Sequence, residues 1–100
     1  MKCNSYNEFF EVIANKTRLS VIEVLNKSPM YVGEICRQLG EEQSKISHSL
    51  RRLHRCHFVE VKREGRRKVY SLNQKTIAPL LRIVSQHVQL YCTKRCWVNT

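Results

Sequence analysis

Apolar residues near the start of the chain recur at helical spacing. The first group consists of Phe9, Phe10, Val12 and Ile13. Ser5 and Glu8 have the spacing of a capping box, in which a serine and a glutamate three residues later satisfy the free amides of a helix N-terminus. The pattern predicts an amphipathic helix that starts after Ser5 and ends near Asn15.

A second group of apolar residues covers almost two faces of the next helix. Its members are Leu19, Val21, Ile22, Val24 and Leu25. Arg18 and Glu23 are left for solvent, so this helix is predicted to form the buried centre of the domain. Thr17 is predicted to cap its N-terminus, and the segment Lys27-Ser28-Pro29 to end it.

The following segment has the pattern of a helix-turn-helix. The segment 30–32 is long enough only for a minimal strand or for a lead into the next helix. Ile35, Cys36 and Leu39 have helical spacing and predict that helix. Gly40 is the left-handed residue with which such helices commonly end. Because another helix starts within a few residues, we expect a helix-turn-helix, whose second helix is the one presented to DNA.

That second helix, QSKISHSLRRLHR at 43–55, divides into an apolar and a basic face. At about 100° per residue, Ile46, Leu50 and Leu53 face the core. The outer face is predicted to carry Ser44, Lys45, Ser47, His48, Arg51, Arg52 and Arg55. The polar side chains at the N-terminal end, Gln43 included, suit base edges, whereas the arginines suit phosphates.

Two segments with alternating apolar and polar residues come next. They cover 58–63 and 66–72, and Glu64-Gly65 between them predicts the turn of a β-hairpin. The cationic residues at its tip are Arg63, Arg66, Arg67 and Lys68. A short ribbon with a cationic end has the shape to enter a minor groove or to lie along the phosphates.

The last helix has two apolar strips. The larger consists of Ile77, Leu80, Leu81, Val84, Val88 and Tyr91, and the smaller of Ile83 and Leu90. Two apolar strips need two surfaces to cover them. We expect the rest of the domain to cover one strip and a second copy of the chain, in a two-fold dimer, to cover the other. The predicted dimer interface consists of Phe9, Phe10, Ile13, Ile77, Leu80, Leu81, Val84, Val88 and Tyr91.

Positive charge is concentrated in the middle of the chain. Eighteen Lys and Arg stand against eight acids, all Glu, for a formal net charge of +10. Residues 1–42 carry five basic and six acidic side chains, residues 43–70 nine and two, and residues 71–100 four and none. Such an excess points to a polyanionic partner, and it coincides with the predicted helix-turn-helix and hairpin.

Composition narrows the function further. A length of 100 residues with 42% hydrophobic content suffices for a single domain over 1–100 with one core. We expect no signal peptide in MKCNSYNEFF and no membrane span. The five cysteines lack the spacing of a disulfide framework, so we expect reduced thiols in a cytoplasmic protein. No enzyme is expected, because the sequence lacks Asp, a Gly-rich phosphate loop and a Ser-His-acid set.

The order of these elements resembles the winged-helix repressors of the ArsR family. The resemblance lies in FFEVIANKTRLSVIEVLNKSPMYVGEIC at 9–36, QSKISHSLRRL at 43–53 and VKREGRRKVYSL at 61–72, which together cover most of the chain. It implies a mainly α fold with a β-hairpin wing, in the order α-α-(short β)-α-α-β-β-α. It also implies operator binding by a homodimer, with release on sensing a metal, a metalloid or another signal.

The family's sensing sites match this sequence poorly. Its metalloid site pairs two cysteines on the helix before the recognition helix, whereas here Cys36 is alone, and of its zinc site on the last helix only His87 is present. Cys92 and Cys96 are four apart and could bind a soft metal ion or As(III) with Cys3 of the partner chain. The alternative is that they are ordinary thiols; Cys36 and Cys56 are expected to fill core positions.

The sequence therefore predicts a sequence-specific DNA-binding transcriptional regulator, a homodimeric repressor whose partners are a palindromic operator and a second copy of itself. The alternative is a winged-helix module that binds protein or RNA and senses no ligand. The predicted DNA contacts are Gln43, Ser44, Lys45, Ser47, His48, Arg51, Arg52, Arg55, Arg63, Arg66, Arg67 and Lys68.

Overall fold

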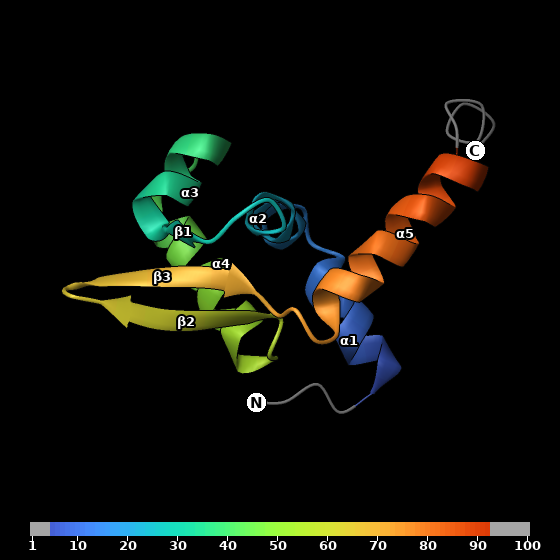
Figure 1. Cartoon of the computed structure of the whole chain (residues 1–100), viewed down its shortest axis with the longest axis horizontal. Helices are drawn as coiled ribbons and strands as arrows, with labels where there is room; N and C mark the ends of the chain where they lie inside the picture. The colour runs from blue at the N-terminus through green and yellow to red at the C-terminus, as the bar shows by residue number, and fades with distance from the viewer. Residues whose placement is uncertain (1–4, 93–100) are drawn as a thin grey trace.

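The computed structural model describes residues 5–92, which form helices and a small sheet (Figure 1). The elements are α1 (Tyr6–Ile13), α2 (Lys16–Leu25), β1 (Met30–Tyr31), α3 (Val32–Leu39), α4 (Gln43–Arg55), β2 (Val59–Glu64), β3 (Arg67–Leu72) and α5 (Ile77–Tyr91). The predicted order of elements is confirmed. The hairpin of β2 and β3 projects at one end of the molecule and α5 at the other (Figure 1).

The sheet is antiparallel, with β3 between β1 and β2. Strands β2 and β3 pair from Val59 opposite Leu72 to Glu64 opposite Arg67. The loop is therefore Gly65-Arg66, one residue later than the predicted turn. Gly65 has a φ of 61°, and a glycine at the first loop position is the signature of a type II′ hairpin turn.

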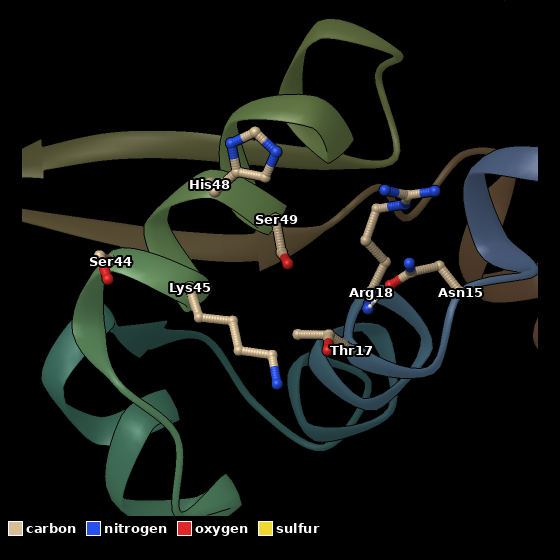
Figure 2. Close-up of a pocket in the computed structure, with 7 residues that line it drawn as sticks. All are labelled: Asn15, Thr17, Arg18, Ser44, Lys45, His48 and Ser49. Atoms are coloured by element: carbon tan, nitrogen blue, oxygen red, sulfur yellow. Dashed lines mark hydrogen bonds between the residues drawn. The ribbon is translucent and has the colours of Figure 1, made fainter.

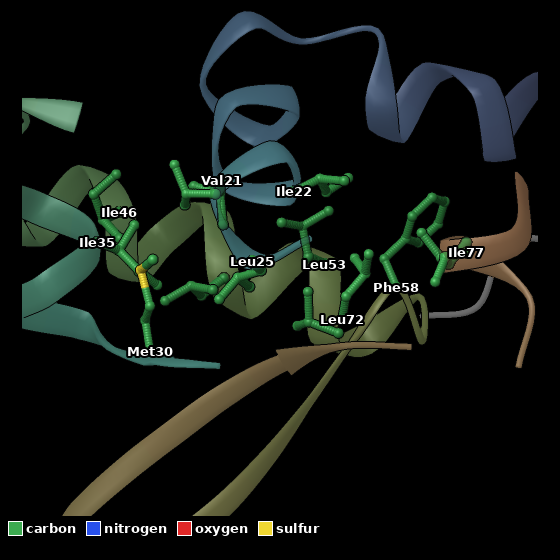
Figure 3. Close-up of a cluster of buried hydrophobic side chains, with 14 of the residues drawn as sticks. Val21, Ile22, Leu25, Met30, Ile35, Ile46, Leu53, Phe58, Leu72 and Ile77 are labelled. Atoms are coloured by element: carbon green, nitrogen blue, oxygen red, sulfur yellow. The ribbon is translucent and has the colours of Figure 1, made fainter. Parts of the chain in front are cut away.

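One apolar core joins the helices to the sheet (Figure 3). Its largest fully buried side chains are Phe58, Ile22, Ile35, Ile46, Leu50, Leu53 and Leu72. The core face predicted for α4 is confirmed, because Ile46, Leu50 and Leu53 are each 0% exposed. Cys36 and Cys56 pack against this core, as expected.

The junction of α1 and α2 differs in detail from the prediction. Asn15, not Thr17, caps α2, since its side-chain oxygen accepts from the Arg18 amide at 2.9 Å. The Arg18 guanidinium is only half-buried, but it does not point freely to solvent: it donates to the carbonyls of Glu11 and Val12 at the end of α1. Leu19 is 39% exposed and does not belong to the core.

A non-glycine residue in the left-handed conformation ends α4. His57 has a φ of 61°, and the Phe58 amide donates to the Leu53 carbonyl at 2.9 Å. This bond belongs to a Schellman-type cap, in which an apolar residue after the helix also contacts its last turn. Asn73 closes the bend by donating to the His57 carbonyl at 2.7 Å. The cap directs the chain from α4 into β2.

Helix α5 is covered by the domain only at its start. Ile77 is 3% exposed and belongs to the core, so its assignment to the dimer interface was wrong. Further along, Val84 and Val88 are 44% and 43% exposed, and Ile83, Leu90 and Tyr91 are more exposed still. None of the described helices is both long and apolar enough to cross a membrane.

Candidate nucleic-acid interface

Helix α4 presents polar and basic side chains over the side opposite its core face. The exposed members are Gln43, Ser44, Lys45, His48, Arg51 and Arg55. The helix lacks an acid in its first turn and has Arg52, His54 and Arg55 in its last turn. Glu41 pairs with Lys45, with Oε1 and Nζ 3.2 Å apart; an exposed pair of this kind contributes little and leaves the lysine available.

A groove runs between α4 and the hairpin. Ser47, Arg51 and His54 line it from the helix, and Lys68 and Tyr70 from β3. Cations of the helix and of the wing therefore border the same surface. A polyanion lying along this groove would contact both elements at once.

Arg52 is less exposed than the other predicted basic contacts of α4. It is half-buried, and its Nε is buried without a hydrogen-bond partner among the described residues. The helical projection explains the difference, because Arg52 follows Ser49 by one turn on the flank that faces α2. Ser49 was not assigned to either face from the sequence, and it is buried at 5% exposure.

The wing contains a cluster of three side chains that joins it to the body. The Tyr31 hydroxyl donates to Glu64 at 3.0 Å, and the Arg67 guanidinium lies 3.8 Å from the centre of the Tyr31 ring. Cation–π contacts of this kind contribute roughly 0.5–1 kcal/mol at exposed sites. Arg63, Arg66 and Lys68 are exposed around the cluster. The tip is therefore cationic, and these contacts connect it to β1.

The pKa of Tyr31 is raised, first by its hydrogen bond to Glu64 and then by the charge of that carboxylate. A raised folded-state pKa means that the bond stabilises the fold below the ordinary value of about 10 and is lost as the pH rises through the raised value. We expect Glu64→Gln to move the Tyr31 titration to lower pH, measured by ring NMR. Glu60→Gln, on the same strand, is the control and should leave the titration unmoved; an unmoved titration in Glu64→Gln would contradict the contact.

The predicted thiol site is only partly described. Cys92 follows α5 directly, half-buried, and its amide donates to the Val88 carbonyl at 2.9 Å. Cys3 and Cys96 lie outside the described residues. Within 5–92, three or more His, Cys, Asp or Glu side chains are nowhere grouped so as to hold a metal ion. His87 lies beside Tyr91, with ring centres 5.1 Å apart.

Comparisons with known proteins agree with this arrangement of helix and wing. Residues 15–61 match the profile of bacterial regulatory proteins of the arsR family. The uncharacterized HTH-type transcriptional regulator Rv0081 of Mycobacterium tuberculosis is 34% identical over 77 residues, 76% of this chain and 68% of its own length. The chain belongs to the arsR family. The resemblance found in the sequence is thereby confirmed.

Another relative and two solved structures extend the comparison. A transcriptional repressor SmtB homolog of Synechocystis is 32% identical over 82% of this chain, which spans only 62% of that relative. The crystal structure of Rv0081 superposes with a TM-score of 0.81 at 30% identity, covering 89% of this chain and 90% of that one. The homodimeric winged helix-turn-helix DNA-binding domain Mb0332 of Mycobacterium bovis superposes with a TM-score of 0.76 at 25% identity, covering 84% of this chain and 78% of that one. The predicted fold class is therefore confirmed.

Proposed function

We propose that this protein is a homodimeric transcriptional repressor that binds a palindromic operator through α4 and the wing. The observation that carries the proposal is the groove between them, bordered by Arg51 of the helix and Lys68 of the wing. A recognition helix in the major groove leaves the flanking phosphates within reach of a basic hairpin. Membership of the arsR family supports this function over a module that binds protein or RNA.

The proposed dimer interface joins the outer sides of α1 and α5. In the single chain these helices expose Phe10 at 55%, Val84 at 44% and Val88 at 43%. Large exposed apolar patches on a soluble domain mark interaction surfaces. A two-fold pair would place two α4 helices against half-sites about one turn of the duplex apart. The homodimeric state of the similar Mb0332 domain supports this arrangement.

The proposed roles of α4 in base readout and of the wing in phosphate contact can be tested directly. We expect Gln43→Ala and Ser47→Ala to change which sequence is preferred, at a cost of about 1–3 kcal/mol each. Arg67→Ala should weaken binding to all sequences alike and reduce the salt dependence, because a phosphate contact carries no sequence information. Competition titrations against matched operator and random duplexes separate these effects. Equal losses on every sequence for all three variants would contradict readout by the helix.

A thiol sensor near the end of α5 is a separate hypothesis. Cys92 lies at the end of the described chain, and with Cys96 and the partner's Cys3 it would bind a soft metal ion or As(III) as thiolate. We expect the Cys92→Ser, Cys96→Ser double variant to keep its DNA affinity and to lose release by such ions or by oxidants. Release measured by fluorescence anisotropy of labelled duplex checks this; an unchanged response would end the hypothesis.

A further inference from the structure

A polar pocket of about 370 Å³ lies between the first turn of α2 and the flank of α4 that faces it (Figure 2). Thr17 and Arg18 line it from α2, and Lys45, His48 and Ser49 from α4. This pocket is separate from the groove along the wing, because it lies on the other side of α4. The N-terminus of a helix carries partial positive charge, so α2 adds to the positive character of the pocket, although Asn15, which also lines it, already accepts from the Arg18 amide.

Ser49 supplies this pocket with a hydroxyl that no protein group occupies. The residue is 5% exposed, and its hydroxyl has no hydrogen-bond partner among the described residues. Figure 2 shows this hydroxyl pointing into the space between Lys45 and Thr17. Among the described residues only the Arg52 Nε is buried without a partner, so the Ser49 hydroxyl is reached by water in the pocket. A ligand atom can replace that water as the partner of the hydroxyl.

The charges around the pocket favour an anion. Lys45 and the Arg18 guanidinium carry positive charge there, although Arg18 already donates to the carbonyls of Glu11 and Val12. The opposing charge is Glu41, whose Oε1 is 3.2 Å from the Lys45 Nζ. That pair is exposed and therefore weak, so a doubly or singly charged oxyanion can compete with Glu41 for the lysine.

We infer that this pocket binds a phosphate-class oxyanion, with the Ser49 hydroxyl and the Lys45 ammonium as its donors. This inference rests on the proposed function, in which α4 lies in the major groove of DNA. The ligand is then a phosphodiester at the edge of that DNA groove. The wing contacts the backbone on one flank of α4, and the pocket holds the backbone on the other. Contacts on both flanks fix the register of a recognition helix. Inorganic phosphate has the same chemistry and is the simplest probe.

The experiment has a phosphate arm and a duplex arm. In the first, amide NMR follows Thr17 and Ser49 while inorganic phosphate replaces chloride at constant ionic strength. We expect saturable shifts in the unaltered protein, none in Ser49→Ala, and several-fold tighter binding in Glu41→Gln, which releases Lys45. In the second, we expect Ser49→Ala to weaken binding to every duplex roughly tenfold, as for a lost hydrogen bond to a charged group. Ser71→Ala, a serine of β3, is the matched control and should change neither arm.

The outcomes distinguish the source of the ligand. Weaker duplex binding in Ser49→Ala assigns the pocket to a DNA phosphodiester, and loss of phosphate binding alone assigns it to a free oxyanion. Absence of phosphate shifts in the unaltered protein, together with unchanged duplex affinity in Ser49→Ala, would overturn the inference. If the unaltered protein binds no duplex, the proposed function fails while the phosphate arm still decides the pocket. Glu41→Gln acts in the opposite direction to Ser49→Ala, so a general loss of folding cannot produce the expected pair of results.

Discussion

Replacing Phe58 by alanine is expected to lower the free energy of unfolding by about 3–5 kcal/mol, the range found when a phenylalanine is removed from a packed core. Phe58 is 1% exposed, and its ring centre lies 4.9 Å from that of Phe9. The side chain thus joins α1 to the bend between α4 and β2. Because the total free energy of unfolding of a small domain is about 5–15 kcal/mol, this one substitution would remove much of the stability of the fold.

Denaturant unfolding at one protein concentration measures this effect. The concentration must be fixed, because dimerisation would add to the apparent stability. Phe58→Leu is the matched control and should lose clearly less, because leucine refills most of the space that alanine leaves empty. A loss for Phe58→Ala within the range of surface substitutions, about 0.5 kcal/mol, would contradict the placement of this ring at the centre of the core.

The double variant Val84→Glu, Val88→Glu is expected to be monomeric and to bind a two-half-site duplex at least about a thousandfold more weakly, close to the level of non-specific binding. The two valines lie one turn apart on the exposed side of α5. In a dimer, two added carboxylates on each chain would be buried against apolar side chains, which is strongly unfavourable. In the single chain they would face water, so the domain should stay folded.

Gln86→Glu, Gln89→Glu adds the same two charges to the opposite side of α5 and is the control for charge alone. Both residues are exposed in the single chain. We expect this control to remain dimeric in sedimentation equilibrium and to lose only a small part of its DNA affinity by repulsion from phosphates. A Val84, Val88 double variant that stays dimeric would place the interface elsewhere.

The elements could be predicted because their apolar periods are strong. Helix α4 begins at Gln43 and ends at Arg55, as the sequence predicts, since Ile46, Leu50 and Leu53 define one face and Gly40 separates it from α3. The residues that cap the helices were harder to predict. Asn15 and Thr17 are both good capping residues, and the choice between them depends on where α1 ends and how Arg18 folds back onto it.

The flanks of α4 could not be predicted from its own sequence. A helical projection separates the core side from the outer side, but Ser49 and Arg52 lie between them, and only the packing of α2 decides their burial. The contact of Tyr31 with Glu64 and Arg67 likewise joins residues far apart in the chain. Ile77 has the spacing of the exposed strip, yet the body of the domain covers the first turn of α5.

Selection of bound fragments from a pool of random duplexes tests whether a dimer of this protein reads DNA through α4. We expect enrichment of one inverted repeat, with half-sites about 10 base pairs or a multiple of this apart. Binding to it should weaken steeply with salt and remain roughly a thousandfold or more tighter than to random duplex. No binding to any duplex at low ionic strength, or an enriched pool without an inverted repeat, would contradict a dimer that reads DNA through α4.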